Sequence, residues 1–142
     1  MEMTLDEIYE TFFWIPGETN EEYYLRVDDA INEAKKYKYL YPFIQPYIPN
    51  KSKVVWEPCA KVIAFKSDED LEPYLNQLFE WLQDMNWPGA DIIYDRLLQM
   101  PFSLIENAYN FSCSRAKRNN DNPWLMALKD FKKDVDYINR NN

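Results

Sequence analysis

The stretch that decides the fold is "EWLQDMNWPGA", residues 80–90. Trp81 comes at the end of a run of apolar residues spaced by three and four, which is the pattern of an amphipathic helix. Asn86 can accept amide hydrogen bonds as a helix cap, and Pro88 has the backbone dihedral of a first helical turn. The stretch therefore predicts a corner between two helices, sealed by its tryptophans. The alternative is that part of this corner contacts a ligand or a partner.

Signals for helices recur on both sides of the corner. Thr4 and Thr19 each begin a capping-box pattern, and Ser67 precedes three acidic residues that suit a helix start. Between Ser67 and the corner, the apolar spacing predicts one unbroken helix. Further helices are predicted from about Val54, Pro88, Pro101 and Pro123. The side chains predicted to face the core are Leu5, Ile8, Tyr9, Phe12, Tyr24, Val27, Ile31, Ala34, Cys59, Val62, Ile63, Phe65, Leu71, Tyr74, Leu75, Leu78, Phe79, Leu82, Met85, Ile92, Ile93, Leu97, Leu98, Leu104, Ile105, Ala108, Phe111, Trp124, Leu128, Phe131, Val135 and Ile138.

The helical pattern is interrupted around residues 38–53. This stretch contains Pro42, Pro46 and Pro49, each of which lacks an amide hydrogen and disfavours helix at the residue before it. We expect an extended, Pro- and Tyr-rich connection there. The chain is then predicted to be a single all-α domain over residues 1–142, with an N-terminal helical extension over residues 1–50 and a second helical part over residues 54–142. Short connections between the later helices predict antiparallel neighbours.

Composition excludes several classes of function. The chain has 142 residues, 46% of them hydrophobic, which is enough for one substantial core. It has no histidine, which removes the usual zinc sites and Ser-His or Cys-His catalysis. With only two glycines, it cannot form a P-loop or a G-x-G-x-x-G turn. No apolar run is long enough for a membrane span or a signal peptide. The two cysteines, Cys59 and Cys113, lack the spacing of a disulfide framework and suit a reducing compartment, so we expect a cytoplasmic protein that needs no cofactor.

The charge distribution indicates the kind of partner. The net charge is -8, which argues against nucleic-acid binding because phosphate neutralisation needs a basic surface. Residues 1–34 carry ten acidic side chains and a single basic one, Arg26. An acidic surface of this kind would attract a basic protein. The alternative interpretation is that these acidic side chains form a solvated surface that binds no partner.

A family resemblance adds to this interpretation. Residues Trp56 to Leu97, and above all their Trp-Leu-x-Asp-Met-Asn-Trp-Pro corner, resemble a family of uncharacterised bacterial domains catalogued as a domain of unknown function. The resemblance implies stacked antiparallel helical hairpins of the HEAT-like type and a bacterial origin. It supplies no catalytic residue, and it implies candidates for protein binding or for the neutralisation of toxins.

The candidate partner-binding residues are aromatic or acidic side chains in the two non-helical regions. Aromatic residues on a proline-punctuated loop cannot all be buried, and exposed aromatic residues are common anchors of recognition. The predicted contacts are Tyr39, Tyr41, Phe43, Tyr47, Asp84 and Trp87. We expect a non-enzymatic domain that binds another protein, in its most specific form an immunity protein that neutralises a toxin.

The alternative function is an all-α, magnesium-dependent nucleotide hydrolase. Such enzymes hold magnesium with carboxylates that converge from two helices, because this hard cation prefers oxygen ligands. Glu69 and Glu72 fit the first half of the pattern, whereas Glu80 and Asp84 miss the second half by one residue. All four were expected on one helix, where they could not converge, so no metal site is predicted.

Overall fold

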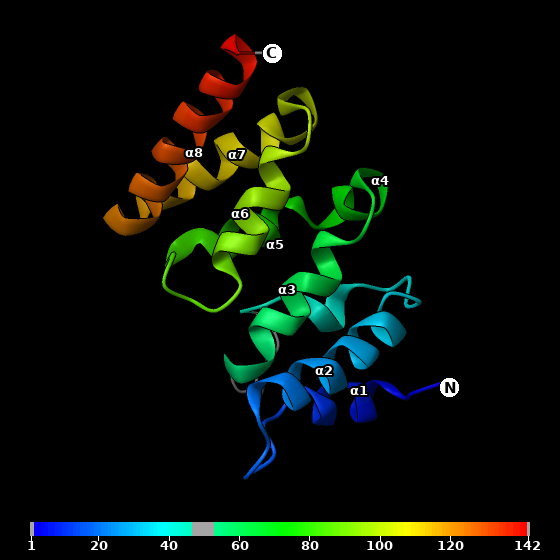
Figure 1. Ribbon diagram of the computed structural model, residues 1–142. Coiled ribbons are helices and arrows are strands. Elements are labelled where there is room, and N and C mark those ends of the chain that lie inside the picture. Colours follow the sequence, from blue (N-terminus) through cyan, green and yellow to red (C-terminus); the bar gives the residue numbers. More distant parts are fainter. Residues whose placement is uncertain (1, 47–52, 142) are drawn as a thin grey trace.

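The computed structural model describes residues 2–46 and 53–141 and is all-α, with no strand in these two ranges. The helices follow one another from α1 and α2 at one end of the molecule to α8 at the other (Figure 1). Longer helices are joined by short 3-10 turns, labelled η. The elements are α1 (Leu5–Thr11), α2 (Asn20–Ala34), η1 (Tyr41–Phe43), η2 (Lys53–Val55), α3 (Trp56–Ala64), α4 (Asp68–Leu71), η3 (Glu72–Tyr74), α5 (Leu75–Glu80), η4 (Trp81–Gln83), α6 (Ala90–Leu98), α7 (Phe102–Arg118) and α8 (Asn122–Arg140).

The predicted helix starts are confirmed where a side chain caps the helix. Thr4 and Thr19 both form complete capping boxes. In each, the threonine hydroxyl accepts the backbone amide of a glutamate three residues on, and the side chain of that glutamate accepts the threonine amide. The Ser67 hydroxyl accepts the Asp70 amide at 3.1 Å, and Pro123 lies in the first turn of α8. These starts depend on local chemistry, so the sequence alone could identify them.

The prediction of one unbroken helix between Ser67 and the corner was wrong. The segment is divided into α4, η3, α5 and η4, and Pro73 lies inside η3. A proline ring cannot donate the helical hydrogen bond and clashes with the preceding turn, which accounts for the break. The apolar side chains still converge, since Leu71, Leu75 and Leu78 are all buried.

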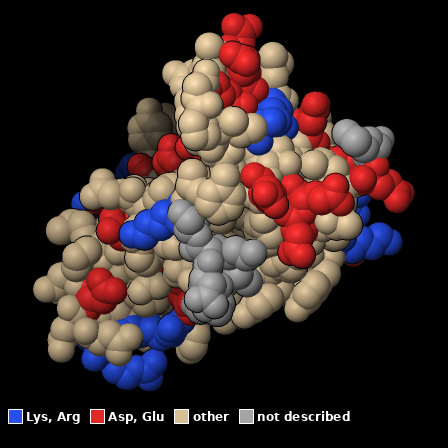
Figure 2. All heavy atoms as spheres, turned by 90° about the horizontal axis from the view of Figure 1, so that it is seen from below, with Lys and Arg blue, Asp and Glu red and all other residues tan. Residues whose placement is uncertain are grey.

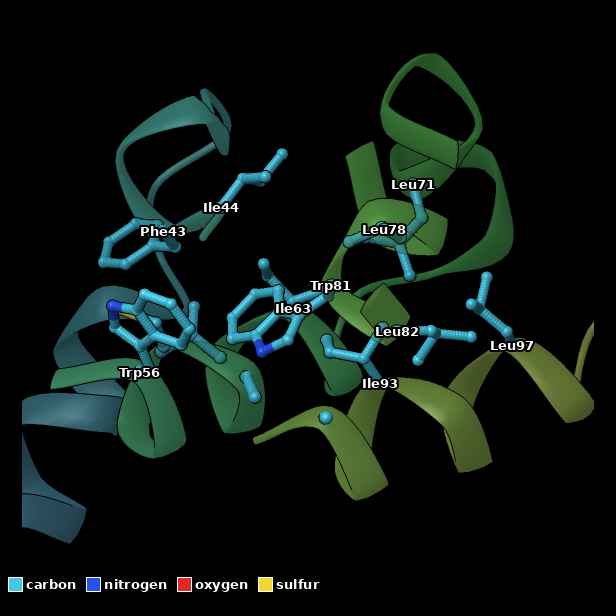
Figure 3. Packing of buried hydrophobic residues seen from close by; sticks show 14 of the residues in the cluster. Phe43, Ile44, Trp56, Ile63, Leu71, Leu78, Trp81, Leu82, Ile93 and Leu97 are labelled. Atoms are coloured by element: carbon cyan, nitrogen blue, oxygen red, sulfur yellow. The ribbon is translucent and has the colours of Figure 1, made fainter. Parts of the chain in front are cut away.

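One continuous apolar cluster extends from Ile8 in α1 to Val135 in α8. In its central part, α3 packs against η1, η2 and α6, and Phe43 and Trp56 meet there with Trp81 and Ile63 (Figure 3). Helix α2 also packs against α3, so the N-terminal helices share their core with the rest of the described chain. The Cys59 side chain is buried in the same cluster, and Cys113 is half-buried.

Four side chains predicted to face the core are exposed instead. They are Tyr24, Phe65, Met85 and Phe111. In α2 the buried stripe is Val27, Ala30, Ile31 and Ala34, and the half-buried Tyr23 extends it where Tyr24 was expected. In α7 the buried face contains Ile105, Ala108, Tyr109 and Ser112, which turns Phe111 outward. In both helices the predicted stripe was otherwise right, and only one residue, Tyr24 in α2 and Phe111 in α7, was placed on the wrong side.

The order of packing is compatible with stacked helical hairpins. Helix α1 contacts α2, α2 contacts α3, α3 contacts α6, and α7 contacts both α5 and α8. The turn between α7 and α8 is short, with Asn120 in the left-handed region at a φ of 54° and Asp121 capping α8 through the Trp124 amide. Asn119 to Asp121 therefore form a loop between α7 and α8.

Cations hold the C-terminal ends of three helices. Arg26 on α2 donates to the carbonyls of Thr11 and Phe13 at the end of α1. Lys66, directly after α3, donates to the carbonyls of Lys35 and Tyr37 at the end of α2, at 2.7 Å for Tyr37. Arg96 on α6 donates to the carbonyls of Ala64 and Lys66 at the end of α3, at 3.1 and 2.7 Å. Each cation comes from a later part of the chain and occupies carbonyls that have no partner within their helix.

The opening stretch forms the predicted corner. The Asp84 carboxylate accepts the Asn86 amide at 2.8 Å, and the Trp81 indole N–H donates to the Pro88 carbonyl at 3.1 Å. Helix α6 begins at Ala90 after Gly89, so the expectation that Pro88 occupies its first turn was wrong. Gly89 has a φ of 83°, and a Cβ there would lie 2.7 Å from the Ala60 Cβ. The corner needs glycine both for this backbone conformation and for its close approach to α3.

Candidate partner-binding site

An exposed apolar turn follows α1 and consists of Phe13, Trp14 and Ile15. Their side chains are 42%, 45% and 51% exposed. Single exposed apolar residues are ordinary on protein surfaces, but three large ones in succession form a contiguous patch. We call this segment the apolar turn.

Hydrogen bonds from α2 fix the backbone of the apolar turn. The Arg26 guanidinium donates to the carbonyls of Thr11 and Phe13, and the Tyr23 hydroxyl donates to the Phe12 carbonyl at 2.8 Å. Arg26 itself is held by two hydrogen bonds to the Glu18 carboxylate, at 2.8 and 2.9 Å. The Trp14 ring lies 5.0 Å from the Tyr23 ring. The turn therefore presents its apolar side chains in one arrangement, which lowers the conformational entropy lost on binding.

The Glu18–Arg26 pair makes this arrangement sensitive to acid. The hydrogen bond from Arg26 holds the pKa of the Glu18 carboxyl below its usual 4.5, and a further hydrogen bond from the Ile15 amide acts in the same direction. A carboxyl whose pKa is lowered in the folded state contributes its stabilisation fully above the unfolded value and loses it as the pH falls through the folded value. The contribution of this pair is therefore present above about pH 4.5 and lost below it.

We expect the NMR signals of the Ile15 amide and the Arg26 Nε–H to shift on acidification with a midpoint below the usual 4.5 of a glutamate. Glu18→Gln should abolish that shift and speed hydrogen exchange of amides in the apolar turn at neutral pH. An acid titration followed by two-dimensional NMR measures both. A midpoint at or above 4.5 would show that Arg26 does not stabilise the carboxylate.

An acidic groove lies beside the apolar turn. It has a volume of about 830 Å³ and is lined by Asp6, Glu7 and Glu10 of α1 together with Met3, Tyr9, Thr11, Arg26 and the apolar turn. Figure 2 views the molecule from the side of α1 and α2 and shows acidic side chains gathered on one half of this face, beside broad uncharged surface. The lining of the groove therefore brings negative charge and the exposed apolar turn next to each other.

The predicted aromatic contacts of the proline-rich connection divide into three groups. Tyr39 and Tyr41 are exposed, with their rings stacked 6.2 Å apart. The prediction for Phe43 was wrong, because its side chain is fully buried and packs against Tyr9 and Tyr37 in the core. Tyr47 lies outside the described residues. Tyr39 lines a second hollow that shares Met3 with the acidic groove.

The two predicted contacts at the corner do not line the groove. The Asp84 carboxylate is used within the corner, where it accepts the Asn86 amide. The half-buried Trp87 ring packs edge-on against Trp56 with centroids 5.3 Å apart. Both residues therefore have a structural role in the corner.

The carboxylates weighed for a magnesium site are dispersed. Glu69 lies on α4, Glu72 begins η3, and Glu80 at the end of α5 is buried and forms an ion pair with Arg115. Among residues 2–46 and 53–141, no group of three or more Cys, Asp or Glu side chains is placed to hold a metal ion. In the same ranges, no helix combines the length and apolar character needed to cross a bilayer.

The apolar turn is not among the predicted contacts, although the sequence contains a signal for it. "FFWIPG", residues 12–17, places four large apolar residues directly before a Pro-Gly pair that stops the helix. Only Phe12 is buried, because α1 ends at Thr11 and the later residues leave the core-facing stripe. The roles of Arg26 and Glu18 depend on contacts between separate elements and have no local signature.

Comparison with known proteins supports the family resemblance. No curated protein and no solved structure matches the chain. A family model described as a domain of unknown function, DUF5071, matches residues 48–140, which is well over half of the chain. The match includes the corner and the helices after it, whereas α1, α2 and the apolar turn precede it. The chain belongs to the DUF5071 family of domains of unknown function.

Proposed function

We propose that this protein works by binding another protein, and that its most specific role is that of an immunity protein which neutralises a toxin. The observation that carries the proposal is the apolar turn, which is exposed although hydrogen bonds hold it in place. Interfaces are commonly anchored by a few large aromatic side chains at the centre of the contact. Trp14 is the most suitable anchor because it is the largest of the three side chains and remains partly accessible.

Charge indicates which proteins would bind. The acidic groove beside the turn attracts a basic partner and repels an acidic one, which contributes specificity and association rate. The proposed setting is the bacterial cytoplasm, which suits two cysteines that form no disulfide with each other. A small acidic domain that covers a basic toxin is the simplest protein that fits this surface.

Trp14→Ala is expected to weaken binding to the partner by at least about thirty-fold, which corresponds to a hot-spot loss of 2 kcal/mol. The matched control is Met126→Ala on α8, because Met126 is also exposed, at 63%, but lies outside the groove. Proteins captured by the wild type and the control but lost with Trp14→Ala identify the partner, and calorimetry with the purified partner gives the affinities.

Two outcomes would contradict the proposal. If the Trp14→Ala and Met126→Ala variants bind the partner with equal affinity, the apolar turn is not part of the interface. If the partner is toxic, coexpression of the wild type should restore growth and coexpression of Trp14→Ala should not; growth restored equally by both would show that neutralisation does not use this surface.

A further inference from the structure

No residue that the structure describes forms an ion pair with the carboxylates of the acidic groove. Within residues 2–46 and 53–141, Asp6 and Glu10 have no hydrogen bond or ion pair from their side chains. Glu7 accepts the Thr4 amide as part of the capping box and keeps its negative charge. Three carboxylates therefore face one hollow without a cation bound to them.

Arg26 does not cancel this charge, although it lines the same groove. Its guanidinium donates to both oxygens of the Glu18 carboxylate and to the carbonyls of Thr11 and Phe13. Because Arg26 forms an ion pair with Glu18, the two side chains together carry no net charge. The groove thus keeps the full charge of Asp6, Glu7 and Glu10 and should prefer a cationic ligand.

The positions of the acids determine the spacing of that ligand. Asp6 and Glu10 are four residues apart on α1, so they lie on one face about 6 Å apart along the helix axis. Two cations on a partner helix have the same separation when they are one turn apart. Trp14 lies beyond the end of α1 and lines the same groove, so an apolar contact lies beside the two charged ones.

We propose that the groove binds a cationic segment of the partner protein, in which two Lys or Arg side chains meet Asp6 and Glu10 and a following apolar side chain packs on the apolar turn. This inference rests on the proposed function, because it names the part of the partner that the same surface recognises. The volume of about 830 Å³ lies within the range of ligand sites in proteins and is enough for several side chains.

The probe is a synthetic alanine-based helical peptide with two lysines one turn apart and a leucine one turn beyond them. At low ionic strength, it should shift the NMR signals of Asp6, Glu10 and Trp14 in a saturable way. Replacing both lysines with glutamine, or the leucine with alanine, should weaken binding. Asp6→Asn with Glu10→Gln should weaken it about five-fold or more, since each exposed pair contributes up to about 1 kcal/mol.

The matched control is Glu21→Gln with Asp29→Asn, which removes the same charge from exposed positions on α2 outside the groove. Equal losses in the two double variants would show that only net charge matters and would overturn the inference. Failure of the peptide to shift these signals would do the same. If concentrating the protein alone shifts them, a second copy occupies the groove, which also overturns it.

The failure of this inference can be distinguished from the failure of the proposed function. If Trp14→Ala abolishes binding of the protein partner while Asp6→Asn with Glu10→Gln leaves it unchanged, the protein binds through its apolar turn without a cationic segment. If both variants bind the partner normally, the proposed function fails as well.

Discussion

Gly89→Ala is expected to lower the free energy of unfolding by about 2 to 5 kcal/mol, because two costs add at one position. An alanine at a φ of 83° adopts the left-handed conformation at a cost of about 1 to 2 kcal/mol. Its Cβ would also lie 2.7 Å from the Ala60 Cβ and 3.0 Å from the Trp56 carbonyl oxygen, which forces α3 and the corner apart. Overpacking of this kind typically costs a further 1 to 3 kcal/mol.

The other glycine is a natural control for this prediction. Gly17 has nearly the same φ, 87°, but a Cβ there would meet nothing within 4 Å. Gly17→Ala should therefore show only the conformational cost of about 1 to 2 kcal/mol. Chemical denaturation of both variants measures the difference. Equal destabilisation would mean that the close approach of Gly89 to α3 has no energetic effect.

Trp124→Ala is expected to destabilise the protein by about 3 to 5 kcal/mol, the usual range for removal of a large buried aromatic side chain. Trp124 is 1% exposed, and its indole N–H donates to the Phe79 carbonyl at 3.1 Å, which connects α8 to α5. The substitution leaves a cavity and also leaves a buried carbonyl without this donor. Both losses weaken the packing of α8 against the rest of the chain.

The Trp124→Phe variant distinguishes the energetic cost of the cavity from that of the lost hydrogen bond. The smaller ring fills much of the site but cannot donate to the Phe79 carbonyl, so we expect a loss of about 1 to 3 kcal/mol. Urea denaturation with constant m-values allows the two variants to be compared. A phenylalanine variant as unstable as the alanine variant would assign the stability to the hydrogen bond and not to the volume of the ring.

The sequence could predict the elements that depend on neighbouring residues. Thr4, Thr19 and Ser67 cap helices by bonding to amides three residues on, and this chemistry is visible without a structure. The stretch over residues 80–90 was recognisable as a corner for the same reason. Predictions based on spacing alone were less secure, because Tyr23 and Tyr24 can both continue an apolar stripe in α2, and only packing against other elements selects Tyr23.

The candidate site was harder to predict than the fold. Phe43 and Tyr41 are neighbours in a proline-punctuated loop and have the same aromatic character, yet η1 buries one against α3 and exposes the other. The apolar turn was missed because an unbroken run of large apolar residues ordinarily indicates core. Its exposure depends on where α1 ends and on hydrogen bonds from Arg26, which is distant in sequence.

The cations that hold the helix ends have a consequence for expressing a shortened protein. The family match begins at residue 48, and a fragment cut there would keep Lys66 but lose the carbonyls of Lys35 and Tyr37 that it binds. It would also uncover the side of α3 that α2 and Phe43 protect. Such a fragment should be poorly soluble and prone to aggregate, so the smallest unit suitable for crystallisation or purification is larger than the segment that the family model matches.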